Sequence, residues 1–183
     1  MSERTPLLIL GLGNVLLEDD GVGSAAVTAL LDRYAPPDDV RVLDGGTLGL
    51  SLLPYVDAAD AVILVDAIKA DEAPGACVRL DGDDVAPAVA TRLSPHQIGV
   101  ADLLDGARWL DRLPRRLMLL GLVPESMELA VGLSPRVRAA LPDLVEQIVA
   151  AAEELGFTFE PRLAHEMAVD TRTLDVARLA GMR

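Results

Sequence analysis

Near-continuous apolar runs recur along this chain, and they constrain its fold more than any other feature. Residues 7–10 read LLIL and break at Gly11, and residues 61–65 read AVILV. Strands of this kind are buried on both faces, as in parallel sheets with helices on either side. Apolar residues recur at helical spacing between residues 22 and 34, directly after the first run. This alternation predicts an α/β fold, namely a three-layer α/β/α sandwich with a largely parallel twisted sheet in a single domain.

The same patterns place the individual elements. Strands are expected at residues 7–11, 40–43, 61–65, 76–80 and 117–122, with a weaker candidate at 128–131, and helices at 21–34, 51–58, 95–110 and 134–155. Ser134 is a suitable N-cap, Pro135 fits a first helical turn, and Gly156 is a suitable C-cap. Pro142 is expected to kink the last helix or to separate its first turns. Residues 81–90, DGDDVAPAVA, are expected to form a loop.

Length and charge narrow the possible classes of function. The chain has 183 residues, which fits one domain. We place an α/β domain at residues 1–157 and a C-terminal extension at 158–183, expected to be mobile or partly helical with a helix near 171–179. The net charge of −13 disfavours nucleic acid as a partner, because phosphate neutralisation needs clustered Lys and Arg.

Cysteine content and hydropathy exclude further classes. Cys77 is the single cysteine, which excludes an internal disulfide framework and a cysteine metal cage. Its setting, GACVRL, favours a small residue in a strand over a catalytic thiol, since neither histidine is near it in sequence. No apolar run approaches the roughly 18 residues of a membrane span, and the N-terminus lacks the layout of a signal peptide. A cytoplasmic protein with no membrane partner is expected.

Carboxylates and one histidine stand where predicted strands end or helices begin. Asp20 precedes the first helix, Asp66 follows the second long apolar run, and His96 comes directly after Pro95 at a helix start. Loops at the carboxyl ends of parallel strands build sites in open α/β folds, and such a donor set can hold a divalent metal. Simpler alternatives exist: Asp20 can cap its helix, Asp66 can bind loop amides, and a lone histidine is more often structural.

A dinucleotide site is another alternative. Gly11 and Gly13 form a GxG-like turn after the first strand, and Asp44 ends the second strand. The third glycine of a GxGxxG motif is replaced by Leu16. The acidic residues 18–20 would repel a pyrophosphate at that helix start, so a tight strand-to-loop turn is the preferred interpretation.

Five motifs occur in an order that resembles a known family. They are GLGNVLLEDDGVG at 11–23, DGGTLG at 44–49, ILVDAI at 63–68, SPHQIGVAD at 94–102 and GLVPES at 121–126. Together they resemble the hydrogenase maturation endopeptidases, which trim the C-terminus of the large subunit of nickel–iron hydrogenases. The resemblance spans residues 5–157. Any one motif is a weak signal, whereas five in order are a strong one.

The resemblance implies roles for individual residues. Asp20, Asp66 and His96 are implied as metal ligands, with Asp19 as a helix cap or a group beside the metal. Asp44 is implied to border the same cleft as a catalytic residue in substrate contact or proton transfer; a turn aspartate that stabilises the double glycine is an equal alternative. The implied metal is nickel, held by the substrate, for which zinc or cadmium can substitute in vitro. Two carboxylates and an imidazole suit such ions better than calcium.

The implied function is that of an endopeptidase. It would remove the C-terminal peptide of the hydrogenase large-subunit precursor after nickel insertion, acting as a monomer with that precursor as its partner. The sequence contains no HExxH motif. Either a metal polarises the scissile carbonyl or activates water, or the site only positions the bond and Asp44 or a neighbouring carboxylate transfers the proton. A nickel carrier or checkpoint protein that does not cleave its partner remains an alternative function.

Overall fold

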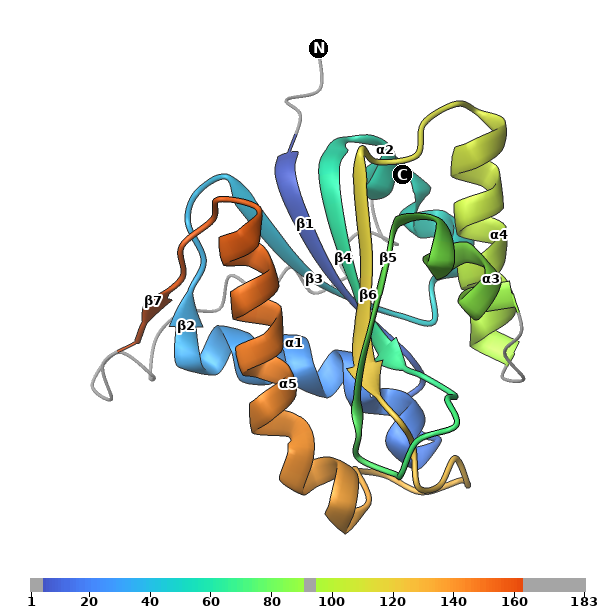
Figure 1. Cartoon of the computed structure of the whole chain (residues 1–183). Coiled ribbons are helices and arrows are strands. Elements are labelled where there is room, and N and C mark those ends of the chain that lie inside the picture. Colours follow the sequence, from blue (N-terminus) through green and yellow to red (C-terminus); the bar gives the residue numbers. More distant parts are fainter. Residues whose placement is uncertain (1–4, 91–94, 163–183) are drawn as a thin grey trace, which may run out of the picture.

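A five-stranded sheet forms the centre of the computed structural model, which describes residues 5–90 and 95–162 but not the side chains of residues 90 and 95–99. The strands are β1 (Thr5–Leu12), β3 (Val40–Gly46), β4 (Ala59–Ala67), β5 (Cys77–Asp81) and β6 (Arg116–Leu122). Their order is β3-β1-β4-β6-β5, with β5 alone antiparallel to its neighbour (Figure 1). The prediction of a largely parallel sheet is therefore confirmed.

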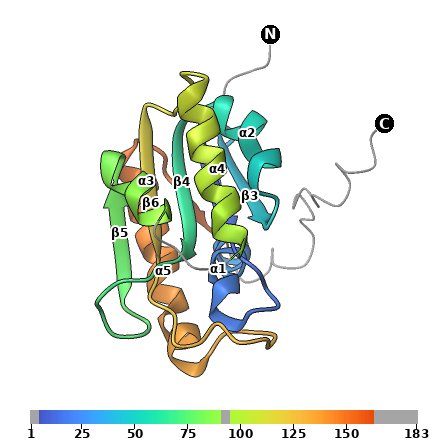
Figure 2. The ribbon, with the colours of Figure 1, turned by 90° about the vertical axis from the view of Figure 1, so that its right-hand side faces the viewer.

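Helices cover both faces of this sheet. The α-helices are α1 (Val22–Arg33), α2 (Leu53–Asp57), α3 (Val85–Ala90), α4 (Pro95–Trp109) and α5 (Pro135–Glu154); the 3-10 helices are η1 (Glu18–Gly21), η2 (Gly49–Leu52) and η3 (Gly82–Asp84). Helices α1 and α5 lie on one face, and α2, α3 and α4 lie on the other (Figure 2). The predicted three-layer sandwich is confirmed.

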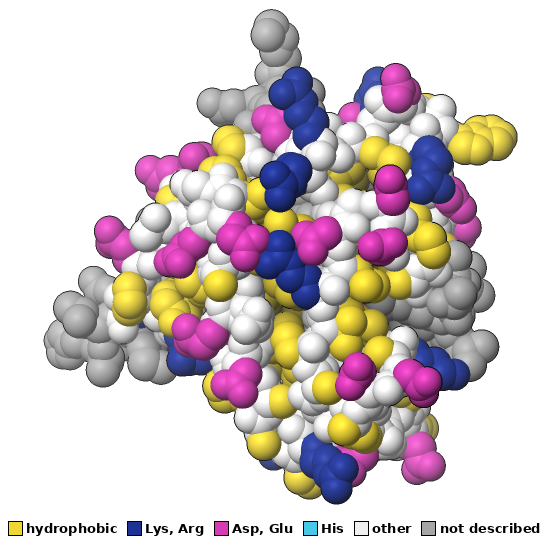
Figure 3. Space-filling model, viewed as in Figure 1, with side chains coloured by type: hydrophobic (Ala, Val, Ile, Leu, Met, Phe, Trp, Pro, Cys, Tyr) yellow, Lys and Arg dark blue, Asp and Glu magenta, His cyan; other side chains and the backbone are white. Residues whose placement is uncertain are grey.

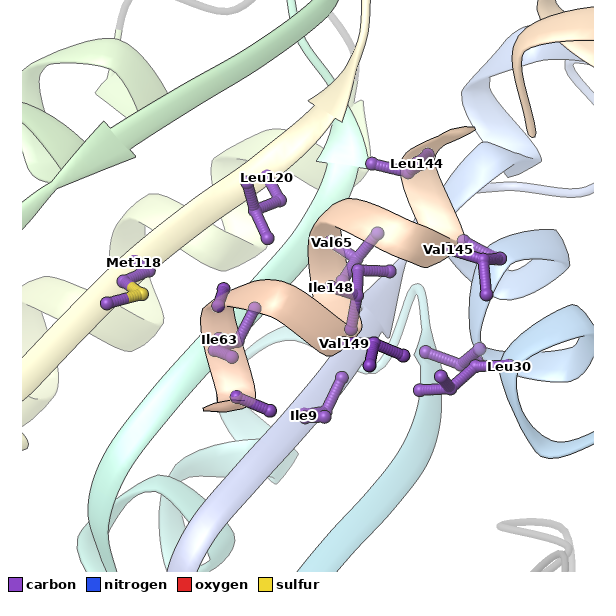
Figure 4. Packing of buried hydrophobic residues seen from close by; sticks show 14 of the residues in the cluster. Ile9, Leu30, Ile63, Val65, Met118, Leu120, Leu144, Val145, Ile148 and Val149 are labelled. Atoms are coloured by element: carbon purple, nitrogen blue, oxygen red, sulfur yellow. The ribbon is translucent and has the colours of Figure 1, made fainter. Parts of the chain in front are cut away.

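Alternate residues of the central strands pack into separate apolar layers, because successive strand side chains point to opposite faces. Ile63 and Val65 of β4 face α1 and α5, where Figure 4 shows them beside Ile148. Val62 and Leu64 face the layer of α4 instead. All four β4 side chains are fully buried. The near-continuous apolar run in the sequence therefore reflects a strand that is covered on both sides.

Two local predictions differ from the structure. Residues 81–90 do not form a loop: η3 and α3 occupy residues 82–90, and α3 buries Val85 and Val89 under the α4 layer. Their i, i+4 spacing supplies a small apolar stripe that stabilises a helix. The weak strand candidate at 128–131 contributes only an isolated bridge between Ala130 and Leu17.

The last helix, α5, runs unbroken through Pro142. Its first turns are therefore not separated from the rest, which was one of the two effects expected of this proline. Ser134 is its N-cap, as predicted, and the Ser134 Oγ accepts from the N–H of Val137 at 3.4 Å. Gly156 follows the helix end with a φ of 94°, a conformation that glycine adopts at little cost. The expected capping residues, Ser134 and Gly156, therefore set the two ends of α5.

Regular structure continues a few residues beyond residue 157. Phe159 is buried in the layer of α1 and α5, and β7 (Glu160–Pro161) pairs with β2 (Tyr34–Ala35). The N–H of Arg162 donates to the carbonyl of Arg33 at 2.8 Å. The helix expected near 171–179 lies outside the described residues.

Both acidic and basic side chains lie on the surface. Acidic side chains are spread among scattered basic ones over the face shown in Figure 3. Within the part of the chain that the structure describes, no helix is both long enough and apolar enough to cross a membrane.

Candidate functional site

The loop after β1 folds around the carboxylate of Asp20. Asp20 lies in η1 and is fully buried. The N–H of Asn14 donates to Asp20 Oδ2 at 3.0 Å, and the N–H of Leu16 donates to Asn14 Oδ1 at 3.0 Å. Gly13 has a φ of 125°, and a Cβ there would meet the carbonyl of Asp20. This loop therefore holds a buried carboxylate. Because that carboxylate would repel a phosphate, the dinucleotide alternative is disfavoured.

A second glycine brings η1 and the start of α1 against the strand ends. A Cβ at Gly23 would meet the carbonyl oxygens of Leu12 and Val65, so only glycine lets α1 approach β1 and β4 this closely. The 3-10 helix η1 in turn packs against β4. The GVG sequence at 21–23 thus sets the acidic trio beside the end of β4, where Asp66 lies.

Asp19 acts as a brace, meaning that its side chain joins two segments of the chain, and it is not part of an open site. It is fully buried, and its carboxylate accepts three backbone N–H groups. Oδ2 accepts from Glu125 at 2.9 Å and Ser126 at 3.1 Å, and Oδ1 accepts from Ser134 at 2.7 Å. These bonds fasten η1 to the loop between β6 and α5 and to the N-cap of α5. Figure 2 shows the two loops side by side, beyond the strand arrowheads.

Asp66 lies one residue before the end of β4 and is also fully buried. Its side chain belongs to the same face as Val62 and Leu64, the face that α4 covers. The N–H of Ala67 donates to Asp66 Oδ1 at 2.7 Å, which holds the carboxylate at the strand end. The partner residue on β6 is Gly121, where a Cβ would meet the carbonyl of Asp66. Two of the three predicted metal ligands therefore lie at the same edge of the sheet.

The third predicted ligand lies at the start of α4. Helix α4 begins at Pro95, which places His96 in its first turn, as predicted, on the layer that Asp66 faces. The side chain of His96 lies outside the described part of the structure. Among the described side chains, no group of three His, Cys, Asp or Glu residues is arranged to hold a metal ion. A site of three ligands thus needs a donor beyond the described carboxylates.

Asp44 reaches the same edge of the sheet but faces the other layer. It pairs in register with Gly11 of β1, which separates it from β4. The Ser24 Oγ of α1 donates to Asp44 Oδ1 at 2.7 Å, and the N–H of Gly46 donates to the same oxygen at 3.1 Å. Neighbouring strands lie about 4.8 Å apart, so Asp44 and Asp66 are separated by about 10 Å across the sheet. Asp44 is therefore not part of a shared carboxylate pair with Asp66.

A pocket of about 450 Å³ adjoins Asp44 on the α1 side. It is lined by residues of α1 and by the two loops that Asp19 joins; the lining residues are Val15, Glu18, Gly21, Ser24, Ala25, Thr28, Ala29, Asp32, Asp44, Val131, Gly132 and Leu133. The pocket is large enough for part of a ligand or a peptide side chain. Its acidic residues favour an occupant without negative charge.

Sequence reasoning missed Ser24, which orients Asp44, and the loop residues around Val131. Ser24 stands one residue after the glycine that allows α1 to approach the sheet. Its role depends on which face of α1 meets β3, and that arrangement carries no local signal. Val131 reaches the pocket only because Asp19 holds its loop from a distance of more than 100 residues in sequence.

Comparisons with known proteins identify the family. Residues 25–151 match the family model described as hydrogenase maturation protease. A hydrogenase 2 maturation protease from Escherichia coli K12 is 42% identical over 159 residues, covering 86% of this chain and 97% of that protein. The hydrogenase expression/formation protein HoxM from Azotobacter vinelandii is 40% identical, covering 82% and 77%.

Solved structures give the same result. The hydrogenase maturating endopeptidase HybD from E. coli superimposes with a TM-score of 0.82 at 40% identity, covering 86% of this chain and 98% of that one. The maturation protease HybD from Thermococcus kodakarensis has a TM-score of 0.64 at 29% identity, covering 82% and 98%. Fold, motif order and sequence identity thus lead to one conclusion: the chain belongs to the hydrogenase maturation protease family.

Proposed function

We propose that this protease removes the C-terminal peptide of a hydrogenase large-subunit precursor after nickel insertion, and that it recognises the bound nickel through Asp20, Asp66 and His96. The observation that carries the proposal is the pair of buried carboxylates, Asp20 and Asp66, at one edge of the sheet. Burying a carboxylate is costly unless it is hydrogen-bonded, paired or bound to a cation. The substrate class is supported by relatives that are named as hydrogenase maturation proteases.

The donor set fits a borderline divalent ion. Asp20 is oriented by the N–H of Asn14 and Asp66 by the N–H of Ala67, and such supporting bonds fix a ligand before the ion arrives. The proposed third donor is the imidazole of His96, and imidazole binds a metal in its neutral form. Nickel belongs to the substrate here, so these residues would test whether the precursor is loaded. Zinc or cadmium can replace it in binding experiments.

Asp44 is proposed to contact the precursor beside the scissile bond and to transfer a proton. Both donors that orient it, Ser24 Oγ and the N–H of Gly46, bind Oδ1. Within the described residues no hydrogen bond to Oδ2 is formed, and that oxygen is the one suited to exchange a proton with the substrate or with water. The adjoining pocket gives the peptide a place next to this oxygen.

Incubation of the protein with nickel-loaded and nickel-free precursor tests this proposal. Mass spectrometry is expected to report loss of the C-terminal peptide from the loaded precursor alone. Binding of the loaded precursor without any loss of mass would instead support the checkpoint alternative. Equal cleavage of both forms would contradict recognition of nickel.

Cys77 is expected to play no part in this reaction. It begins the edge strand β5 and is exposed. Desolvation, and to a lesser degree the charge of Asp143, raises the pKa of the Cys77 thiol. A thiol with a raised pKa is protonated at neutral pH and is a poor nucleophile. Cys77→Ser and treatment with iodoacetamide are both expected to leave the cleavage rate at its wild-type value, and inhibition by either would reopen a role for the thiol.

A further inference from the structure

Exposed apolar side chains gather on the two loops beside the candidate site. Leu129 is 83% exposed and Val131 is 85% exposed, and Leu16 on the facing loop is 55% exposed. The loops are joined at Ala130, whose N–H donates to the Leu16 carbonyl at 3.1 Å and whose carbonyl accepts from the N–H of Glu18 at 2.9 Å. We call Leu16, Leu129 and Val131 the apolar rim. Large apolar side chains that are held exposed on a hydrogen-bonded loop are typical of an interaction surface.

The backbone of the same segment has hydrogen-bonding capacity left over. Ala130 uses its N–H and carbonyl toward the loop of Leu16. Within the described part of the chain, the N–H and carbonyl groups of Leu129 and Val131 form no hydrogen bond. Apolar side chains next to open backbone donors and acceptors are the combination that binds an extended polypeptide, since main-chain bonds give affinity and side chains give specificity.

The apolar rim is continuous with the groups assigned to the reaction. Glu18, which is bonded to Ala130, precedes Asp19 and Asp20 directly. Val131 also lines the pocket that adjoins Asp44. The segment 129–131 therefore borders both the Asp20 loop and the pocket beside Asp44. The N–H groups of Ser126 and Ser134 donate to the Asp19 carboxylate, and these bonds hold both ends of this segment in place.

We propose that the apolar rim binds the precursor's segment next to the scissile bond, in an extended conformation paired with residues 129–131. This inference rests on the proposed function, because it names the surface that delivers the peptide to that site. The occupant is a polypeptide with apolar side chains and without acidic residues near the pocket, where Glu18, Asp32 and Asp44 would repel them. Docking here is separate from recognition of nickel, which the carboxylates perform.

The double variant Leu129→Ser/Val131→Ser tests the side-chain contacts. Both positions are almost fully exposed, so the fold and its melting temperature are expected to be unchanged. With nickel-loaded precursor, we expect KM to rise about tenfold or more, because the variant lacks the two apolar contacts that binding buries. The value of kcat is expected to stay close to that of the wild type. Trp109→Ser is the matched control: Trp109 is 91% exposed but ends α4 at the opposite end of the sheet, and KM is expected to stay unchanged.

The backbone contacts are tested by Val131→Pro against Val131→Ala. Both variants lose the valine side chain, but only proline removes the N–H. The proline variant is expected to have a KM about fivefold above that of the alanine variant, the effect of one lost hydrogen bond. Equal KM values, with both proteins folded, would overturn pairing with the main chain.

The outcomes separate this inference from the proposed function. An unchanged KM in the double serine variant, with an active wild type, overturns the inference and leaves the function standing. A wild type that binds the loaded precursor without cutting it, together with a double variant that binds about tenfold more weakly, supports the apolar rim and overturns the protease proposal. A wild type that neither binds nor cleaves overturns both. If the wild type is a dimer and the double variant is a monomer with an unchanged KM, the apolar rim would be assigned to self-association instead.

Discussion

Asp20→Asn is expected to lower kcat/KM for the nickel-loaded precursor by at least about 100-fold while the protein stays folded. Replacing groups that merely support a metal ligand costs about 10–100-fold, so loss of a ligand should reach or exceed the upper end of that range. The fold should persist because the asparagine Oδ1 can still accept the N–H of Asn14, the bond that Asp20 Oδ2 now accepts at 3.0 Å. Cleavage kinetics with circular dichroism as the fold check measure both effects.

An exposed acid on α4 provides the control. Asp102→Asn removes an exposed carboxylate from α4, and this variant is expected to cleave at the wild-type rate. Near-normal cleavage by folded Asp20→Asn protein would remove Asp20 from the site. An unfolded Asp20→Asn protein would show instead that the carboxylate is needed for the loop itself.

Asp19→Asn is expected to have the opposite phenotype, with a large loss of stability. The buried carboxylate accepts three backbone N–H groups, and an asparagine would turn its own NH₂ toward at least one of them. Hydrogen bonds to a charged group contribute about 1.5–3 kcal/mol each, so a loss of about 3 kcal/mol in the free energy of unfolding is expected. In a protein of this size that corresponds to a fall in Tm of about 6–12 °C. Urea and thermal unfolding measure it.

The Asp19→Asn protein should still cleave the loaded precursor at a temperature well below its Tm, because Asp19 is not assigned to the metal. An equal loss of activity in folded Asp19→Asn and Asp20→Asn proteins would contradict the distinction between the two acids. A wild-type Tm in Asp19→Asn would contradict the role of Asp19 as a brace. Of these two adjacent residues, Asp19 is thus expected to affect stability and Asp20 to affect recognition of the precursor.

Much of the fold could be predicted because its signals are local. The run AVILV needs cover on both faces, and Ser134, Pro135 and Gly156 end their helix by their own backbone preferences. The prediction of a loop at residues 81–90 is wrong. The helix there depends on the burial of Val85 and Val89 beneath α4, a tertiary contact that propensity does not report.

The candidate site could be predicted only in part, and for a physical reason. Parallel strands bring their carboxyl ends to one edge, so the location of Asp66 beside the acidic trio follows from strand assignment. The distinction between Asp19 and Asp20 does not, because it depends on amide groups that lie more than 100 residues away in sequence. The position of Asp44 on the opposite face of the sheet follows from the register of β3, with Ser24 supplying the contact.

The central claim is that a histidine from α4 completes a site with Asp20 and Asp66. The chain contains two histidines: the backbone of α4 places His96 at this edge of the sheet, and His165 lies outside the described residues. The most direct measurement is the rate of C-terminal peptide release from nickel-loaded precursor, compared between His96→Ala and His165→Ala. We predict a loss of at least about 100-fold for His96→Ala and the wild-type rate for His165→Ala. Wild-type cleavage by a folded His96→Ala protein would contradict the claim.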